Sequence, residues 1–254
     1  LATDGYLDLA SLARTVHIGE LGLDGRLRPV AGVLPAVVAA ARAGLTHVVV
    51  PRANEDEARL VAGMTVVGAV SLGGVALWHG ADLERSELAP VPAALVPASR
   101  PSAGDLSEVI GQHEAVDALI AAAAGGHHML MCGPPGAGKT MLASRLPGIL
   151  PDLDDEAALE VSSIRSLSGI GIDGLVREPP FESPHHSASV AALVGGGSRV
   201  VRPGAIARAT NGVLFLDEAA EFASSALDAL RQPLETGSIT IHRSGVTAAF
   251  PARF

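Results

Sequence analysis

The sequence of 254 residues has one cysteine, few aromatic residues and a net charge of −9. The lone cysteine, Cys132, excludes an internal disulfide bond and favours a reducing compartment, so we predict a cytoplasmic protein. The negative net charge argues against a generally basic coat for nucleic acid, although it leaves room for a local basic patch. The acidic N-terminus lacks the basic region of a signal peptide, which argues against secretion.

Residues 60–78 carry no charge over about the length of a membrane span. Glycines recur through this run, and Thr65–Val70 has the composition of a buried strand. Ser71 is placed to cap a short helix that ends near Trp78. We therefore predict buried α/β structure here and no membrane partner.

Lysine is also nearly absent: the only one, Lys139, lies in the P-loop pattern G-x-x-x-x-G-K-[S/T]. The pattern comprises Gly133, Pro134, Pro135, Gly136, Ala137, Gly138, Lys139 and Thr140. In a P-loop the backbone N–H groups cradle the phosphates, the lysine reaches the β- and γ-phosphates, and the hydroxyl of Thr140 binds Mg²⁺. A lysine ammonium is compact enough for such a loop, whereas the guanidinium of arginine is broad and planar. The alternative interpretation is a Gly-Pro turn that precedes a helix.

The segments around this loop supply the order of strand, loop and helix that the motif requires. His128–Cys132 is predicted to be a buried strand, with Cys132 a small buried residue at its end. A helix is predicted from Lys139 to about Leu146. Another helix, Glu114–Ala124, is predicted to end at Gly125 and Gly126.

A second apolar run, Val213–Leu216, ends in Asp217 and Glu218, which is the Walker B pattern. A buried strand of a parallel sheet carries such acids to its carboxyl end, where ligands bind. Asp217 is predicted to hold Mg²⁺, and Glu218 to orient and deprotonate the attacking water. The alternative is that both acids cap the helix that follows.

The acid pair also favours an ATPase over other P-loop classes. The base-reading motif of a GTPase needs a lysine, and the only lysine is already in the P-loop. Leu167–Ile170 is a poor match to the signature of a transporter ATPase. We therefore predict catalytic roles for Lys139 and Glu218, with ATP and Mg²⁺ as cofactors.

Residues 89–104 are rich in proline, alanine and serine, which predicts an extended linker between domains 1–88 and 105–254. Local patterns predict five further elements: a helix at Leu34–Ala43, a strand at Thr46–Pro51, helices at Asn54–Val61 and Ser224–Glu235, and a hairpin arm at Ser238–Arg243 that turns at Ser244 and Gly245.

Two histidine pairs and one loop with several arginines have more than one interpretation. His127-His128 and His185-His186 have no Cys or Glu at the spacing of a zinc site, so we predict no metal there. The loop from Gly195 to Arg208 is locally basic. It is either solvated or in contact with phosphates of DNA or nucleotide.

Taken together, these motifs resemble the Mg-chelatase-like AAA+ ATPases of the ComM/YifB type. The resemblance is carried by Gly111-Gln112, Ala123–His127, the P-loop, Ser183–Ser189, Ala192–Gly197, Arg202–Gly204 and Gly212–Glu218. The N-terminal stretch Gly19–Val30 resembles that family's first domain, which is similar to the proteolytic domain of Lon. The resemblance covers almost the whole chain.

The resemblance implies an α/β fold with two parts. The first is a partial N-terminal domain similar to Lon and ribosomal protein S5, and the second is a partial P-loop AAA+ domain with three αβα layers. It also implies a homo-hexameric motor that hydrolyses ATP with Mg²⁺ and acts on DNA, and it places Gly111 and Gln112 near the adenine. Two alternatives are a chelatase-type motor subunit for metal insertion into porphyrin and an inactive nucleotide-binding remnant of a split gene.

Three departures from the family pattern matter. Pro179–Glu182 stands where the family has Arg-Pro-Phe-Arg, which puts an anion contact there in doubt. Ala36 aligns near the lysine of a Ser-Lys peptidase pair, so that chemistry is excluded. The chain runs from Leu1 to Phe254, before the family's sensor-1 strand, arginine finger and lid. We therefore expect a fragment, truncated at both ends, that alone folds poorly, binds nucleotide weakly and hardly hydrolyses it.

Overall fold

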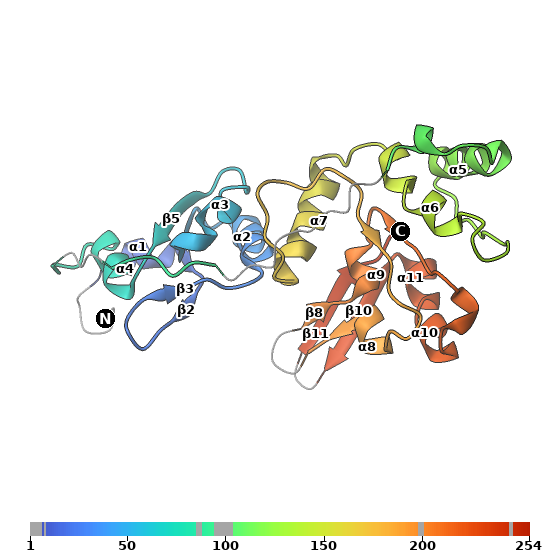
Figure 1. The fold of residues 1–254 in the computed structure, drawn as a ribbon. Coiled ribbons are helices and arrows are strands. Elements are labelled where there is room, and N and C mark those ends of the chain that lie inside the picture. The colour runs from blue at the N-terminus through green and yellow to red at the C-terminus, as the bar shows by residue number, and fades with distance from the viewer. Residues whose placement is uncertain (1–6, 8, 85–87, 94–103, 198–200, 244–245) are drawn as a thin grey trace. The chain divides into compact units, whose positions relative to one another are not determined.

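The valine run Val48–Val50 lies in the central strand of a three-stranded parallel sheet with the order β1-β4-β5. Successive side chains of a strand point to opposite faces. Val48 and Val50 pack against α2 (Val33–Arg42) and α3 (Glu55–Ala58), whereas Val49 packs against α4 (Leu72–Trp78) (Figure 1). A strand covered on both faces is apolar at every position, which confirms the strand predicted at Thr46–Pro51. The sheet comprises β1 (Thr15–His17), β4 (His47–Pro51) and β5 (Thr65–Ala69).

This computed structural model describes residues 7, 9–84, 88–93, 104–197, 201–243 and 246–254. The chain divides into two units, the first formed by Leu1–Ala98 with Ser162–Leu175 and the second by Ser99–Val161 with Val176–Phe254. Most of the linker predicted at residues 89–104 lies outside the described residues, and the division into domains 1–88 and 105–254 stays a prediction. Within the described residues, no helix is both long and apolar enough to cross a membrane.

The first unit adds short elements around its sheet. Ser71 caps α4 as predicted, since its hydroxyl accepts a hydrogen bond from the backbone N–H of Gly74 at 3.2 Å. The helix predicted at Asn54–Val61 is shorter, because α3 begins at Glu55 and ends at Ala58. The remaining elements of this unit are α1 (Leu9–Ala13), β2 (Glu20–Leu21), β3 (Leu27–Arg28) and the 3-10 turn η1 (Arg52–Asn54).

Asn54 is buried, with 1% of its surface exposed, and it bonds to the backbone of Val30. Its Oδ1 accepts the Val30 N–H, and its Nδ2 donates to the Val30 carbonyl, both at 3.1 Å. Asn54→Leu removes both hydrogen bonds and leaves the N–H and the carbonyl of Val30 without these partners. We therefore expect the free energy of unfolding to fall by about 2–4 kcal/mol in urea titrations. Asp56→Ala, at an exposed neighbouring position, is the control and should change it little. A loss below about 1 kcal/mol for Asn54→Leu would show that these bonds are not important.

The second unit contains the predicted helix before the P-loop and the predicted hairpin. α5 (His113–Gly125) is followed by Gly126, whose φ of 60° is the left-handed conformation common after helices. β10 (Ser238–Arg243) pairs antiparallel with β11 (Val246–Pro251), and the predicted turn at residues 244–245 lies outside the described residues. The helix predicted at Ser224–Glu235 is instead two helices, α10 (Ser224–Asp228) and α11 (Arg231–Thr236). Pro233 lacks the N–H that a continuous helix would donate four residues back, which accounts for the break.

Other elements of this unit are short. They are η2 (Leu106–Glu108), α6 (Lys139–Ala143), η3 (Leu146–Ile149), β6 (Phe181–Glu182), α8 (Val190–Val194), β7 (Gly195–Gly196), β8 (Arg202–Pro203), α9 (Ala205–Arg208), β9 (Val213–Leu214) and η4 (Ala219–Glu221). α7 (Asp155–Leu167) contributes residues to both units.

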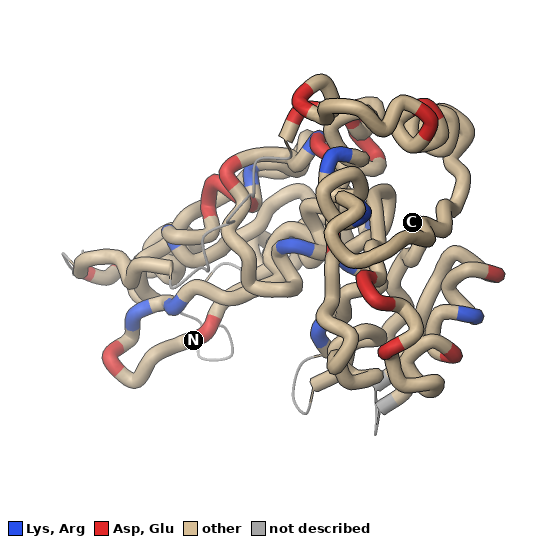
Figure 2. Tube along the Cα trace, turned by 45° about the vertical axis from the view of Figure 1, so that its right-hand side comes forward, with Lys and Arg blue, Asp and Glu red and all other residues tan. Residues whose placement is uncertain are grey.

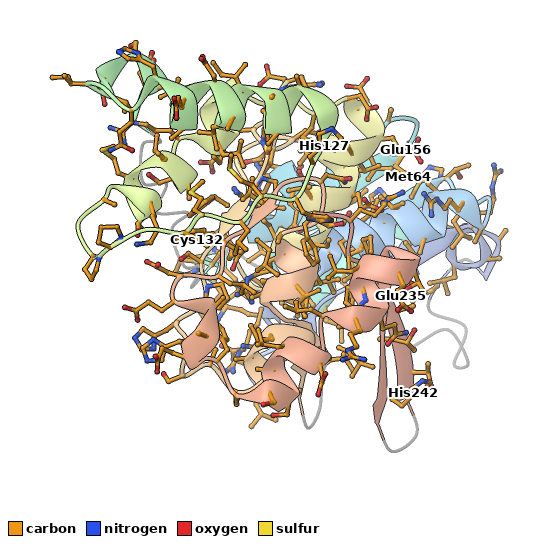
Figure 3. All side chains as sticks on the ribbon, turned by 90° about the vertical axis from the view of Figure 1, so that its right-hand side faces the viewer. Met64, His127, Cys132, Glu156, Glu235 and His242 are labelled. Carbon is orange, nitrogen blue, oxygen red and sulfur yellow. The ribbon has the colours of Figure 1, made fainter. Side chains whose placement is uncertain are left out.

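The strand predicted at His128–Cys132 was wrong, and so was the burial predicted for Cys132. This segment has no regular secondary structure and pairs with no described strand, Leu130 is 84% exposed, and Cys132 is exposed (Figure 3). A strand forms only where a neighbour satisfies its backbone N–H and C=O groups, and the described residues offer none here. The second predicted strand, Val213–Leu216, is also shortened, because β9 has a parallel partner only in β6.

Candidate nucleotide-binding site

The P-loop and the acid pair meet through one side-chain contact, although they are 77 residues apart in sequence. The hydroxyl Oγ1 of Thr140 donates a hydrogen bond to Oδ2 of Asp217 at 2.8 Å. Both side chains are solvent-accessible, so an ion in solution can reach them. Hydroxyl and carboxylate oxygens are hard donors of the kind that Mg²⁺ prefers. The two residues predicted to hold the metal are therefore adjacent.

The backbone of the loop has the conformation that its glycines allow. Gly136 and Gly138 have φ values of 79° and 83°, which L side chains rarely adopt. A Cβ at Gly138 would also lie only 3.1 Å from Nε2 of Gln112. Gly136 and Gly138 are therefore required by the turn that leads into α6.

Lys139 is the first residue of α6, and its side chain turns back across the loop. Its Nζ donates hydrogen bonds to the carbonyl of Gly133 at 2.9 Å and to that of Pro134 at 3.1 Å. These contacts hold the ammonium of the chain's only lysine at the loop, where a bound phosphate would need a cation.

Gln112 contacts the P-loop directly. Its Nε2 donates to the carbonyl of Ala137 at 3.1 Å, and both Gly111 (φ 75°) and Gln112 (φ 54°) are left-handed. A left-handed glutamine is uncommon, and such strain persists where surrounding contacts maintain it. The structure thus places Gly111-Gln112 beside the loop, and their contact with adenine stays a prediction.

The side chain of Arg145, which follows α6, bonds residues 105–108 to the end of that helix. Its Nε donates to the carbonyl of Asp105 at 3.0 Å, and its Nη2 lies 3.0 Å from Oε2 of Glu108. The backbone N–H of Ser107 donates to Oδ1 of Asp105, which lowers the pKa of that carboxyl below its usual value. Residues 105–108 are therefore anchored close to the P-loop helix.

Glu218 lies at the start of η4 with a φ of 52°, again left-handed. Its backbone N–H donates to Oδ1 of Asp217 at 3.1 Å, which fixes the two acids relative to each other. The alternative interpretation made these acids helix caps, but the side chain of Glu218 makes no capping hydrogen bond to η4. Its carboxylate instead faces His186, with Oε2 at 3.3 Å from Nδ1.

The contact between His186 and Glu218 was missed from the sequence, which weighed His185-His186 only as metal ligands. No group of three or more His, Cys, Asp or Glu side chains among the described residues could hold a metal ion. The signal that could have found the contact is the Ser183–Ser189 motif, which belongs to the same family pattern as the acid pair.

One arginine of the locally basic stretch, Arg208, makes a structural contact. Arg208 pairs with Glu182 at 2.9 Å, so the acid that replaces a family arginine has a partner inside the fold. A Cβ at Gly204 would lie 2.2 Å from the carbonyl oxygen of Leu193, so the close packing at this position requires glycine. Arg202 is exposed, and Arg199 lies outside the described residues. Figure 2 shows basic and acidic residues interspersed along the trace of the described chain.

Comparison with known proteins gives consistent matches. The family model described as "Magnesium chelatase, subunit ChlI" matches residues 105–254, and that described as "Subunit ChlI of Mg-chelatase" matches residues 3–54. The chain is 52% identical over 245 residues to an uncharacterized protein of Mycobacterium tuberculosis, covering 96% of this chain and 48% of that protein.

Two further relatives match over the whole chain. The competence protein ComM of Haemophilus influenzae is 45% identical over 257 residues, covering 100% of this chain and 50% of that protein. The uncharacterized protein YifB of Escherichia coli is 45% identical over 255 residues, covering 100% and 49%. The chain spans about half the length of the curated relatives it matches.

Proposed function

The chain belongs to the magnesium chelatase subunit ChlI family, in its ComM/YifB group, and from this we propose that the complete gene product hydrolyses ATP with Mg²⁺. The observation that carries the proposal is the hydrogen bond between Thr140 and Asp217, because it joins the two motifs that an ATPase needs in one place. We further propose that the protein works as a homo-hexameric AAA+ motor on DNA, in the cytoplasm. The relative named as a competence protein, which matches over the whole chain, supports DNA as the partner.

The residues present fit a magnesium ion, since a hydroxyl and a carboxylate lie 2.8 Å apart at the end of the loop. Mg²⁺ usually takes one or two protein oxygens and fills its remaining positions with water and phosphate oxygens. Thr140 and Asp217 would hold the ion, which would supply positive charge beside the β- and γ-phosphates.

The other residues of the site have separate tasks. The backbone N–H groups of residues 133–138 would bind the phosphates, and Gln112 would support the loop through its bond to Ala137. Lys139 would leave the carbonyls of Gly133 and Pro134 to bind the γ-phosphate, where negative charge develops. Glu218 would take the proton from the attacking water.

Phosphate release by the complete gene product tests this proposal. We expect turnover of ATP with Mg²⁺ and a loss of at least about 10²-fold when EDTA removes the metal, because the phosphate charge is then not neutralised. Full turnover in EDTA would contradict the assignment of Thr140 and Asp217. The released phosphate is measured with and without added Mg²⁺ at constant ionic strength.

The partner is tested separately from the chemistry. Added DNA should raise turnover, and the increase should decline with rising salt, as for any contact with phosphates. Turnover that does not change with added DNA but rises with a porphyrin-binding protein would favour the chelatase-type alternative. The family description also suggests that alternative. A protein that binds ATP without hydrolysing it under any of these conditions would be the inactive remnant.

A further inference from the structure

His186 is the one described side chain that contacts the carboxylate of Glu218 in the structure. Its Nδ1 lies 3.3 Å from Oε2 of Glu218, and the two residues come from segments 32 positions apart. An ionised carboxylate can only accept hydrogen bonds, so His186 stabilises it here only through an N–H group at Nδ1.

His185 holds the ring of His186 in place. The two ring centroids are 4.0 Å apart, with planes inclined by 37°. The backbone N–H of Ser187 donates to Nδ1 of His185 at 3.2 Å. The Ser187 hydroxyl lies 2.8 Å from the same nitrogen, so two contacts with Ser187 hold the ring of His185. The ring of His185 then restricts the movement of the ring of His186.

Glu218 needs such a partner because little else fixes its side chain. The side chain is 66% exposed, and an exposed glutamate samples several rotamers. A general base is effective only when its oxygen is held within hydrogen-bonding reach of the water. Contact with His186 occupies Oε2 and leaves Oε1 able to accept a hydrogen bond from a water molecule.

We propose that His186 is a positioning residue, which holds the Glu218 carboxylate in the orientation that activates water during ATP hydrolysis. This inference rests on the proposed function, and it adds a role for the Ser183–Ser189 motif that neither nucleotide binding nor metal binding explains. His186 itself touches neither Lys139, Thr140 nor Asp217 among the described contacts. Its effect should therefore be on the rate of the chemical step and not on ATP affinity.

The test compares three variants of the complete gene product in steady-state ATP hydrolysis. His186→Ala removes the donor, and we expect kcat to fall about tenfold with KM for ATP unchanged. His186→Asn should restore most of kcat, because the asparagine amide nitrogen is attached, like Nδ1, to Cγ. His186→Gln, which moves the donor one bond further out, should not restore it. His242→Ala, at an exposed histidine on β10, is the control.

Each outcome of these measurements either supports or contradicts the positioning role of His186. A kcat that is unchanged or raised in His186→Ala, or an asparagine variant no better than the alanine variant, would overturn it. A wild-type protein without turnover would instead overturn the proposed function. Magic-angle-spinning NMR of ¹⁵N-histidine protein tests the contact without activity: Glu218→Gln should shift the Nδ1 signal that His186→Asn removes. An unmoved signal would show that the contact does not exist in the assembled protein.

Discussion

Replacing Lys139 with alanine is expected to weaken ATP binding about 10- to 100-fold and to reduce turnover about a further 10²- to 10³-fold. Charge-assisted hydrogen bonds to phosphate oxygens account for the first loss, and the absence of a cation where charge develops accounts for the second. Lys139 is the only lysine of the chain, so no neighbouring ammonium can substitute for it. Equilibrium binding of a fluorescent ATP analogue and phosphate release measure the two effects.

Two further variants show whether charge alone is sufficient. Lys139→Arg keeps the positive charge, yet we expect it to lose most activity, since the loop that binds Nζ through Gly133 and Pro134 suits a compact ammonium. Arg231→Ala removes one positive charge on the exposed surface of α11 and should leave both measurements unchanged. Normal turnover in Lys139→Ala would mean that the P-loop is not the site of hydrolysis.

Replacing Glu218 with glutamine is expected to lower kcat about 10²- to 10³-fold while leaving ATP affinity nearly unchanged. Glutamine has the size of glutamate but cannot take a proton from water. The variant still offers an oxygen and a donor, and Asp217 keeps its bond with Thr140, so the metal-binding pair should persist. Single-turnover hydrolysis together with ATP binding separates these two effects.

Glu221→Gln is the matched control, because Glu221 is an exposed acid at the end of the same 3-10 turn. It should retain the turnover of the wild type. If Glu218→Gln also hydrolyses ATP within a few-fold of the wild-type rate, Glu218 is not the general base and the role proposed for His186 is withdrawn with it.

The elements predicted correctly are those whose pattern depends on near neighbours in sequence. The run Val48–Val50 is apolar on both faces and forms a strand covered by helices on both sides. The helix before the P-loop ends next to Gly126 because glycine adopts the left-handed conformation at little cost. Ser71 caps α4 through an atom only three residues away.

The incorrect predictions have two causes: a strand without a distant partner, and a proline that interrupts a helix. Like Val48–Val50, the segment His128–Cys132 contains an apolar run, yet it forms no strand among the described residues, because backbone groups pair only with a neighbouring strand. α10 and α11 separate where the apolar pattern continued, since Pro233 cannot donate the hydrogen bond that joins successive turns. Apolar pattern alone did not distinguish these cases.

By itself, the sequence determined the chemistry available at the site: a phosphate loop with one lysine, a hydroxyl for a metal, and two acids after an apolar run. These features depend on residue type and on spacing within short segments, so they can be identified without the three-dimensional structure. Only the tertiary structure decided which of them meet. It joined Thr140 to Asp217, set Gln112 against the loop and brought His186 to Glu218, because contacts between distant segments depend on how the whole chain packs.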